Sequence, residues 1–150
     1  MGRKLTATEI ARLDKLHGEK VESFLDSGAG SCYLADTRVA RIVRDNLLHF
    51  DGVKYRLVAW CVMPNHVHLV LTPLSGHGLA SILHSWKSYT AKKANRLLNR
   101  NGEFWQREYY DRLIGDEAEY HHTVNYVLDN PRKAGLLNWP WVDVCGNADE

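Results

Sequence analysis

The sequence predicts a single α+β domain in which helices back an antiparallel β-sheet. The chain has 150 residues with a hydrophobic fraction of 45%, and its apolar residues change from helical to strand spacing and back. A chain of this length can build one hydrophobic core. Because no internal repeat, linker or low-complexity segment divides the chain, we expect residues 1–150 to form one domain.

Two helices are expected before the first strand. Residues 8–26 carry an apolar stripe at helical spacing, and Thr6 with Glu9 forms a capping-box pattern at the start. Residues 37–50 carry a second stripe of this kind, and Asp36 stands where it can cap the helix N-terminus.

A β-hairpin is expected next. Residues 55–63 and 66–72 are rich in Val, Leu and aromatic residues, and the turn-forming pair Pro64-Asn65 separates them. Since a two-stranded sheet is marginally stable by itself, these two segments supply fewer strands than the fold needs.

The second half of the chain is expected to be mainly helical. Residues 79–98 have the spacing of a long amphipathic helix, and residues 104–114 form an aromatic and charged segment that is either a strand or an ordered loop. A last helix begins at Asp116 and is expected to end by Asn130, because Pro131 disfavours a helical conformation of the preceding residue.

Composition restricts the location and the partners of the protein. The formal net charge is +1, so the chain as a whole does not attract nucleic acid. Cys32, Cys61 and Cys145 are scattered and form neither a disulfide framework nor a thiolate metal site. No secretory signal or membrane span is visible, so we expect a cytoplasmic protein with no membrane partner.

Two histidines of the second predicted strand are candidate metal ligands. His66 and His68 stand at i and i+2, so their side chains point to one face, with Cα atoms roughly 6 to 7 Å apart. Imidazole nitrogens at this spacing can converge on one divalent cation. The polar alternation of an ordinary exposed strand gives the same pattern, so the pair alone does not identify a reaction.

The last predicted helix carries a second, polar face. His122, Tyr126 and Asn130 are spaced four residues apart and lie away from the apolar stripe. A phenol acts as a nucleophile when a neighbouring cation or base activates it. The alternative is a structural tyrosine at the boundary of an amphipathic helix.

Four segments in order carry a family resemblance. They are CVMPNHVHL at 61–69, WKS at 86–88, FWQREYYD at 104–111 and YVLDNPRKAGL at 126–136. Each motif is weak alone, but together they resemble the single-tyrosine HUH transposases, in particular the REP-associated, IS200-like branch. The resemblance covers roughly residues 36–141.

The resemblance implies a ferredoxin-like or RRM-like antiparallel sheet backed by helices, with the histidine pair on a central strand. It implies cleavage and rejoining of single-stranded DNA near hairpins, with Mg²⁺ or Mn²⁺ and a 5′-phosphotyrosine intermediate. By motif position, His66 and His68 would bind the metal, Tyr126 would be the nucleophile and Asn130 would be the third protein ligand.

One departure from the family pattern stands out. Family members carry a hydrophobic strand before the first helix, next to the histidine strand, and the sequence predicts no such strand here. Three explanations remain open: the chain is truncated at its N-terminus, another strand fills the gap, or the protein is a catalytically inactive relic that binds nucleic acid.

Other nucleophiles also remain open. Tyr89, Tyr109 and Tyr110 are alternatives, but none has Asn or Gln four residues later, where a helical third ligand would fall. Tyr126 is therefore preferred. A metal-dependent hydrolase with a water nucleophile is a further alternative.

The segment from Ser81 to Arg112 is the expected DNA surface. It contains seven basic and three acidic residues, a local net charge of +4, and interleaved aromatic residues that can stack on unpaired bases. Within it, the expected DNA contacts are Lys87, Arg96, Trp105, Gln106 and Arg107. Lys87 is the strongest phosphate candidate, whereas Trp105 also fits a core position. The expected partner is single-stranded or hairpin DNA, bound by a monomer or a homodimer.

Overall fold

The computed structural model describes residues 5–8, 19–27, 32–106 and 109–144. The elements are β1 (Val21–Asp26), the 3-10 helix η1 (Tyr33–Ala35), α2 (Thr37–His49), β2 (Tyr55–Val62), β3 (His66–Pro73), α3 (Leu79–Leu98), β4 (Tyr109–Leu113), α4 (Glu117–Lys133) and β5 (Val142–Val144). The strands form one antiparallel sheet in the order β4-β1-β3-β2-β5. Within these ranges, no helix is long and apolar enough to cross a lipid bilayer.

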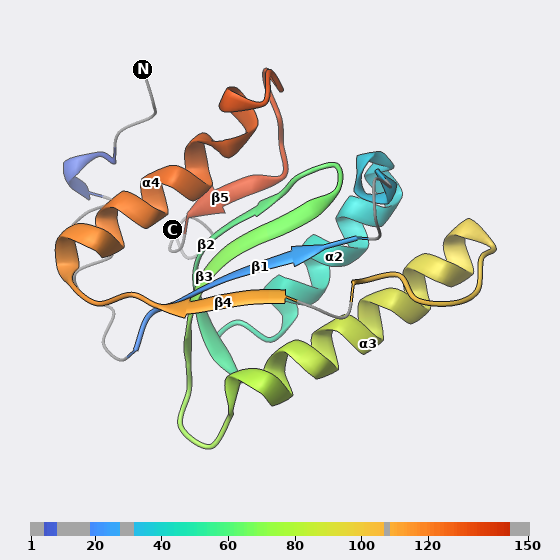
Figure 1. Ribbon diagram of the computed structural model, residues 1–150, viewed down its shortest axis with the longest axis horizontal. Coiled ribbons are helices and arrows are strands. Elements are labelled where there is room, and N and C mark those ends of the chain that lie inside the picture. Colours follow the sequence, from blue (N-terminus) through green and yellow to red (C-terminus); the bar gives the residue numbers. More distant parts are fainter. Residues whose placement is uncertain (1–4, 9–18, 28–31, 107–108, 145–150) are drawn as a thin grey trace.

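Six of these elements, all except η1, α4 and β5, form a ferredoxin-like unit. The order β1-α2-β2-β3-α3-β4 with strands arranged β4-β1-β3-β2 is the βαββαβ topology. The strand β5 extends the sheet beyond β2, and α4 covers the face opposite α2 and α3 (Figure 1). The predicted α+β class and the antiparallel sheet backed by helices are confirmed.

The strand that the sequence seemed to lack is present as β1. The periodicity places the segment VESFLD in a helix spanning residues 8–26, but this segment pairs with β3 over its whole length, from Val21 opposite Leu71 to Asp26 opposite His66. Its burial alternates with period two, as strand geometry requires. The predicted helix is therefore wrong at this segment. Because β1 is present, the lack of a strand is no longer a reason to expect a truncated or inactive protein. The rest of the predicted helix, including Glu9, lies largely outside the described residues.

The sheet divides the interior into two cores. On one face, side chains of β2 and β3 such as Val62, Val67 and Leu69 pack under α2 and α3. On the other face, Cys61 and Val70 pack under the apolar stripe of α4. The stripe consists of Tyr120, Val124, Val127 and Leu128, as its spacing predicts.

The helix starts follow the predicted capping. The Asp36 carboxylate accepts a hydrogen bond from the Arg38 backbone N–H at 2.9 Å, at the start of α2. At the start of α4, Asp116 accepts from the Glu119 N–H at 2.8 Å, and the Glu119 side chain accepts from the Gly115 N–H at 3.0 Å. Both helices therefore begin where their sequences place a side-chain acceptor.

The C-terminal part of α4 differs from the prediction. The helix continues through Pro131 to Lys133 instead of ending by Asn130. Pro131 is buried, its carbonyl accepts the Leu136 N–H at 2.8 Å, and Arg132 pairs with Asp129 at 3.0 Å. These contacts offset the tendency of Asn130, as the residue before a proline, to avoid the helical conformation.

The buried Cys61 allows a direct test of the core under α4. Burial raises the pKa of its thiol to about 12, whereas Cys32 is exposed. We expect iodoacetamide at mildly alkaline pH to alkylate Cys32 in the native protein and to reach Cys61 only after denaturant is added. Peptide mapping by mass spectrometry measures both rates. Equal rates at the two cysteines in the native protein would contradict this core.

Candidate active site

The α4-facing side of β1 and β3 brings the histidine pair together with an aromatic ring. Phe24 lies opposite His68 in the register of β1 and β3. Its ring stacks on His66 with a centroid separation of 4.4 Å and meets His68 edge-on at 5.5 Å. The two imidazoles thus lie on one face, as predicted, and Phe24 contacts both of them.

Each imidazole has one ring nitrogen that is hydrogen-bonded and one that is not. His66 Nδ1 lies 2.8 Å from Asn65 Oδ1, and His68 Nε2 lies 2.7 Å from Glu22 Oε2. These oxygen partners favour a proton on the bonded nitrogen. His66 Nε2 and His68 Nδ1 are buried and have no hydrogen-bond partner in the described part of the chain. Two lone pairs are therefore left for a ligand, and neutral imidazole nitrogens are common metal donors.

The surroundings of both imidazoles favour their neutral form. Burial is the largest cause and lowers the pKa of His66 and of His68 below the usual histidine value. The charge of Asp26 acts against this shift at His66, and the hydrogen bond that His68 donates to Glu22 acts against it at His68. A neutral imidazole keeps the lone pair that a cation requires.

Tyr126 lies beside this pair. Its ring meets the His68 ring edge-on, with centroids 5.7 Å apart. The apolar stripe of α4 packs on the sheet and holds the tyrosine at the margin of the core, where its side chain is 46% exposed. The Lys133 ammonium lies 4.6 Å from the centre of the Tyr126 ring. An accessible tyrosine, a cation and two buried imidazole nitrogens that no described residue engages therefore lie on the same side of the sheet.

Glu22 connects the histidine strand to the helix that carries the tyrosine. One carboxylate oxygen accepts from His68, and the other accepts from Arg112 Nε of β4 at 3.1 Å. Arg112 also forms an ion pair with Glu119 and donates to Thr123 Oγ1 at 3.4 Å, both on α4. The sequence does not single out Glu22, because its periodicity predicts a helix at this segment. The alternation of Glu22, Phe24 and Asp26 along a strand would have been the signal.

The third predicted ligand, Asn130, is not joined to the histidine pair by a hydrogen bond among the described residues. Asn130 lies one turn after Tyr126 and is half-buried, but its side chain makes no hydrogen bond to either histidine among the described residues. In the same ranges, no group of three or more His, Cys, Asp or Glu side chains could hold a metal ion. The observed donors are the two imidazoles, and the role of Asn130 stays a prediction.

The competing tyrosines have different surroundings. Tyr89 belongs to α3, on the other side of the sheet. Tyr110 lies opposite Phe24 in the register of β1 and β4, so the β1 strand separates it from β3 and His68. The side chain of Tyr109 lies outside the described part. Among the described tyrosines, Tyr126 is the one whose ring contacts a histidine of the pair.

The predicted DNA contacts divide into internal and exposed residues. Trp105 is buried, and its indole N–H donates to Thr90 Oγ1 at 2.9 Å, which contradicts a role as an exposed base platform. Lys87 donates to the Gln106 carbonyl at 3.1 Å, and burial lowers the pKa of Lys87. The Gln106 N–H in turn donates to the Asp26 carbonyl at 2.9 Å. Arg96 is exposed on α3, and Arg107 lies outside the described residues.

A ferredoxin-like sheet with a histidine pair on a central strand, beside a tyrosine of a following helix, is the arrangement that the resemblance to the single-tyrosine transposases implies. A comparison with protein families agrees with this class. The chain belongs to the family described as Transposase IS200 like, whose sequence model matches residues 36–130.

Individual relatives point the same way. The chain is 26% identical over 101 residues to a putative REP-associated tyrosine transposase of Haemophilus influenzae, covering 58% of this chain and 57% of the relative. It is 26% identical over 91 residues to the REP-associated tyrosine transposase of Escherichia coli K12, covering 58% and 53%. The matches thus span just over half the length of these curated relatives.

Two solved structures share the fold. One is a REP-associated tyrosine transposase bound to a REP hairpin, with a TM-score of 0.65 and 20% identity, covering 85% of this chain and 77% of that one. The other is a putative transposase from Deinococcus radiodurans R1, with a TM-score of 0.53 and 17% identity, covering 81% and 94%. At these identities the similarity establishes the architecture.

Proposed function

We propose that this chain cleaves and rejoins single-stranded DNA, with Tyr126 as the nucleophile that forms a covalent 5′-phosphotyrosine link. One observation carries the proposal: His66 and His68 each have a buried nitrogen that no described residue engages, and they lie beside an accessible tyrosine whose ring contacts His68. Membership of the transposase family supports the same reaction.

The proposed reaction exchanges one phosphate ester bond for another and needs no external energy source. The Tyr126 phenol oxygen attacks the scissile phosphorus, the bond from phosphorus to O3′ breaks, and the phenol proton ends on the released 3′-hydroxyl. The phosphate stays on the 5′ side as an ester of the tyrosine. Attack by a 3′-hydroxyl reverses these steps and restores the DNA backbone, because the ester conserves the energy of the cleaved bond.

His66 Nε2 and His68 Nδ1 are proposed to hold a divalent cation, Mg²⁺ or Mn²⁺, with Asn130 as a third protein ligand. A bound cation would orient the scissile phosphate and stabilise its developing charge. Glu22 holds the His68 ring so that Nδ1 stays free, and Lys133 places a further positive charge next to the Tyr126 ring.

The proposed partner is hairpin DNA with single-stranded flanks, bound by a monomer or a homodimer. The solved relative with a REP hairpin supports a hairpin. Arg96, which is exposed, would supply one phosphate contact, and Lys87 and Arg107 are proposed to supply others. The local charge of +4 in this segment would make binding sensitive to salt.

A covalent adduct tests the proposal. Protein and Mn²⁺ are incubated with labelled hairpin oligonucleotides whose flanks have randomised sequence, and the products are separated on a denaturing gel. The proposal predicts a protein-linked label that EDTA prevents. Cleavage without a linked label would favour a water nucleophile. Salt-sensitive binding without cleavage would favour an inactive nucleic-acid-binding relic.

Glu22→Gln tests whether the carboxylate supports metal binding. The amide can still accept a hydrogen bond from His68 but lacks the charge, so we expect the Mn²⁺ affinity to fall by about 10- to 100-fold. Isothermal titration calorimetry measures the affinity, and circular dichroism checks the fold. Glu19→Gln, the same change at an exposed position, is the matched control. An unchanged affinity in Glu22→Gln would remove Glu22 from the site.

A further inference from the structure

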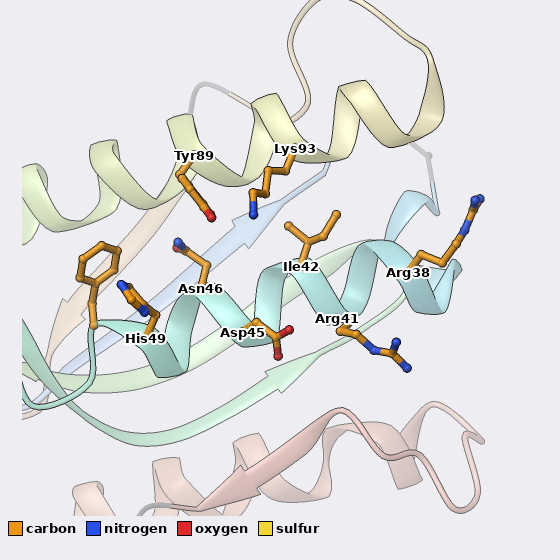
Figure 2. Close-up of a pocket in the computed structure, with 9 residues that line it drawn as sticks. Arg38, Arg41, Ile42, Asp45, Asn46, His49, Tyr89 and Lys93 are labelled. Carbon is orange, nitrogen blue, oxygen red and sulfur yellow. The ribbon is translucent and has the colours of Figure 1, made fainter.

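A groove between α2 and α3 lies on the opposite side of the sheet from Tyr126. It encloses about 340 Å³, within the range of small-ligand sites. Figure 2 shows that Tyr89 and Lys93 reach from α3 toward α2, while Asn46 points from α2 toward them. Ile42 and Phe50 line its apolar part. The two helices thus direct three polar side chains into one hollow.

Asn46 is the unusual member of this group. Its side chain is only 4% exposed, yet its carbonyl oxygen Oδ1 has no hydrogen-bond partner among the described residues. Its Nδ2 group donates no hydrogen bond to a described residue either. A buried carbonyl without a donor is unfavourable by a free energy similar to that of a hydrogen bond. The amide therefore presents an unused acceptor and an unused donor to the groove.

Tyr89 and Lys93 supply the complementary chemistry. The Tyr89 ring is 44% exposed, and the Lys93 ammonium lies 4.8 Å from its centre, against one face. Lys93 forms no ion pair with a described carboxylate. A planar base can stack on a tyrosine ring, and an ammonium can contact a phosphate.

We propose that this groove binds one unpaired adenine nucleotide. The Asn46 amide matches the N6 donor and the N7 acceptor of adenine, which asparagine contacts as a pair in DNA recognition. Tyr89 stacks on the base, and Lys93 contacts its phosphate. The inference rests on the proposed DNA-processing function, which supplies the source of the nucleotide. That source is a single-stranded flank of the DNA substrate rather than a free nucleotide.

The test distinguishes binding of the base from binding of the phosphate, and binding of DNA from binding of a free nucleotide. Uniformly ¹⁵N-labelled protein is titrated with 5′-dAMP, 5′-dTMP, inorganic phosphate, and the oligonucleotides (dA)₆ and (dT)₆, without metal, and its NMR shifts are recorded. The proposal predicts shifts of the Asn46 side-chain amide with dAMP and (dA)₆, tighter binding of (dA)₆, and at least about fivefold weaker binding of the thymine probes. Shifts of the same size with phosphate alone, or no shift at Asn46 with any adenine probe, would overturn it. Tighter binding of dAMP than of (dA)₆ would overturn the assignment to DNA.

Variants at exposed positions keep the test independent of folding. Tyr89→Ala and Lys93→Gln are each expected to weaken (dA)₆ binding by about fivefold or more. Lys92→Gln, the same charge change on an exposed neighbour that does not line the groove, is expected to leave binding unchanged. Equal loss in Lys92→Gln and Lys93→Gln would show general charge attraction and contradict the site. Adduct formation at Tyr126 is scored separately, so a failure of the proposed function and a failure of the groove can be told apart.

Discussion

Tyr126→Phe is expected to abolish the covalent protein–DNA adduct, with a loss of cleavage rate of roughly 10⁴-fold or more, as for removal of other catalytic nucleophiles. The phenol oxygen is the proposed attacking atom, and phenylalanine has none. The structural effect is expected to be small, because the side chain is half-exposed and its hydroxyl makes no hydrogen bond among the described residues. DNA affinity, measured by fluorescence anisotropy, should therefore stay close to that of the unaltered protein.

Two further tyrosines serve as matched controls for this change. Tyr89→Phe and Tyr110→Phe remove the same oxygen from exposed rings that make no ring contact with the histidine pair in the described structure. Both should keep the adduct. An adduct that persists in Tyr126→Phe and is lost in one of the controls would assign the nucleophile elsewhere.

His68→Ala is expected to lower the affinity for Mn²⁺ by about 100-fold or more, since loss of an outer-shell partner alone typically lowers metal affinity 10- to 100-fold. The substitution removes Nδ1, one of the two buried lone pairs that no described residue engages. Isothermal titration calorimetry gives the affinity. His66→Ala should have a comparable effect through loss of Nε2.

His122→Ala is the control for the histidine substitutions. His122 is exposed on α4 and belongs to the polar face predicted from the sequence. Its replacement should leave Mn²⁺ binding unchanged. If His122→Ala lowers the affinity as much as His68→Ala, the cation is not held by the strand pair.

Much of the fold follows from local sequence signals. The hairpin, α2 and α3 are long periodic segments with clear turns or caps, and their observed bounds agree closely with the predicted ones. The β1 segment is short, and its apolar positions at Val21 and Phe24 also fit helical spacing. Pairing with β3, 40 to 50 residues further along the chain, decides its conformation. The strand β5 has three residues, too few to show a period.

The candidate site divides in the same way. The histidine pair and Tyr126 come from local motifs, so the sequence indicates them directly. The position of Glu22 follows from the strand register. Its side chain lies on the α4-facing side of β1 and contacts His68 on the neighbouring strand β3. The burial of Trp105 also depends on tertiary packing, which the spacing of residues does not specify.

Mass spectrometry of the protein–DNA adduct tests the central claim most directly. After cleavage of a hairpin oligonucleotide in Mn²⁺, the protein is digested with protease and nuclease, and the peptide that carries a nucleotide phosphate is sequenced. We expect the modification on Tyr126, together with an equal amount of DNA that ends in a free 3′-hydroxyl. A nucleotide on Tyr89, Tyr109 or Tyr110, or cleaved DNA with no modified peptide, would contradict the account.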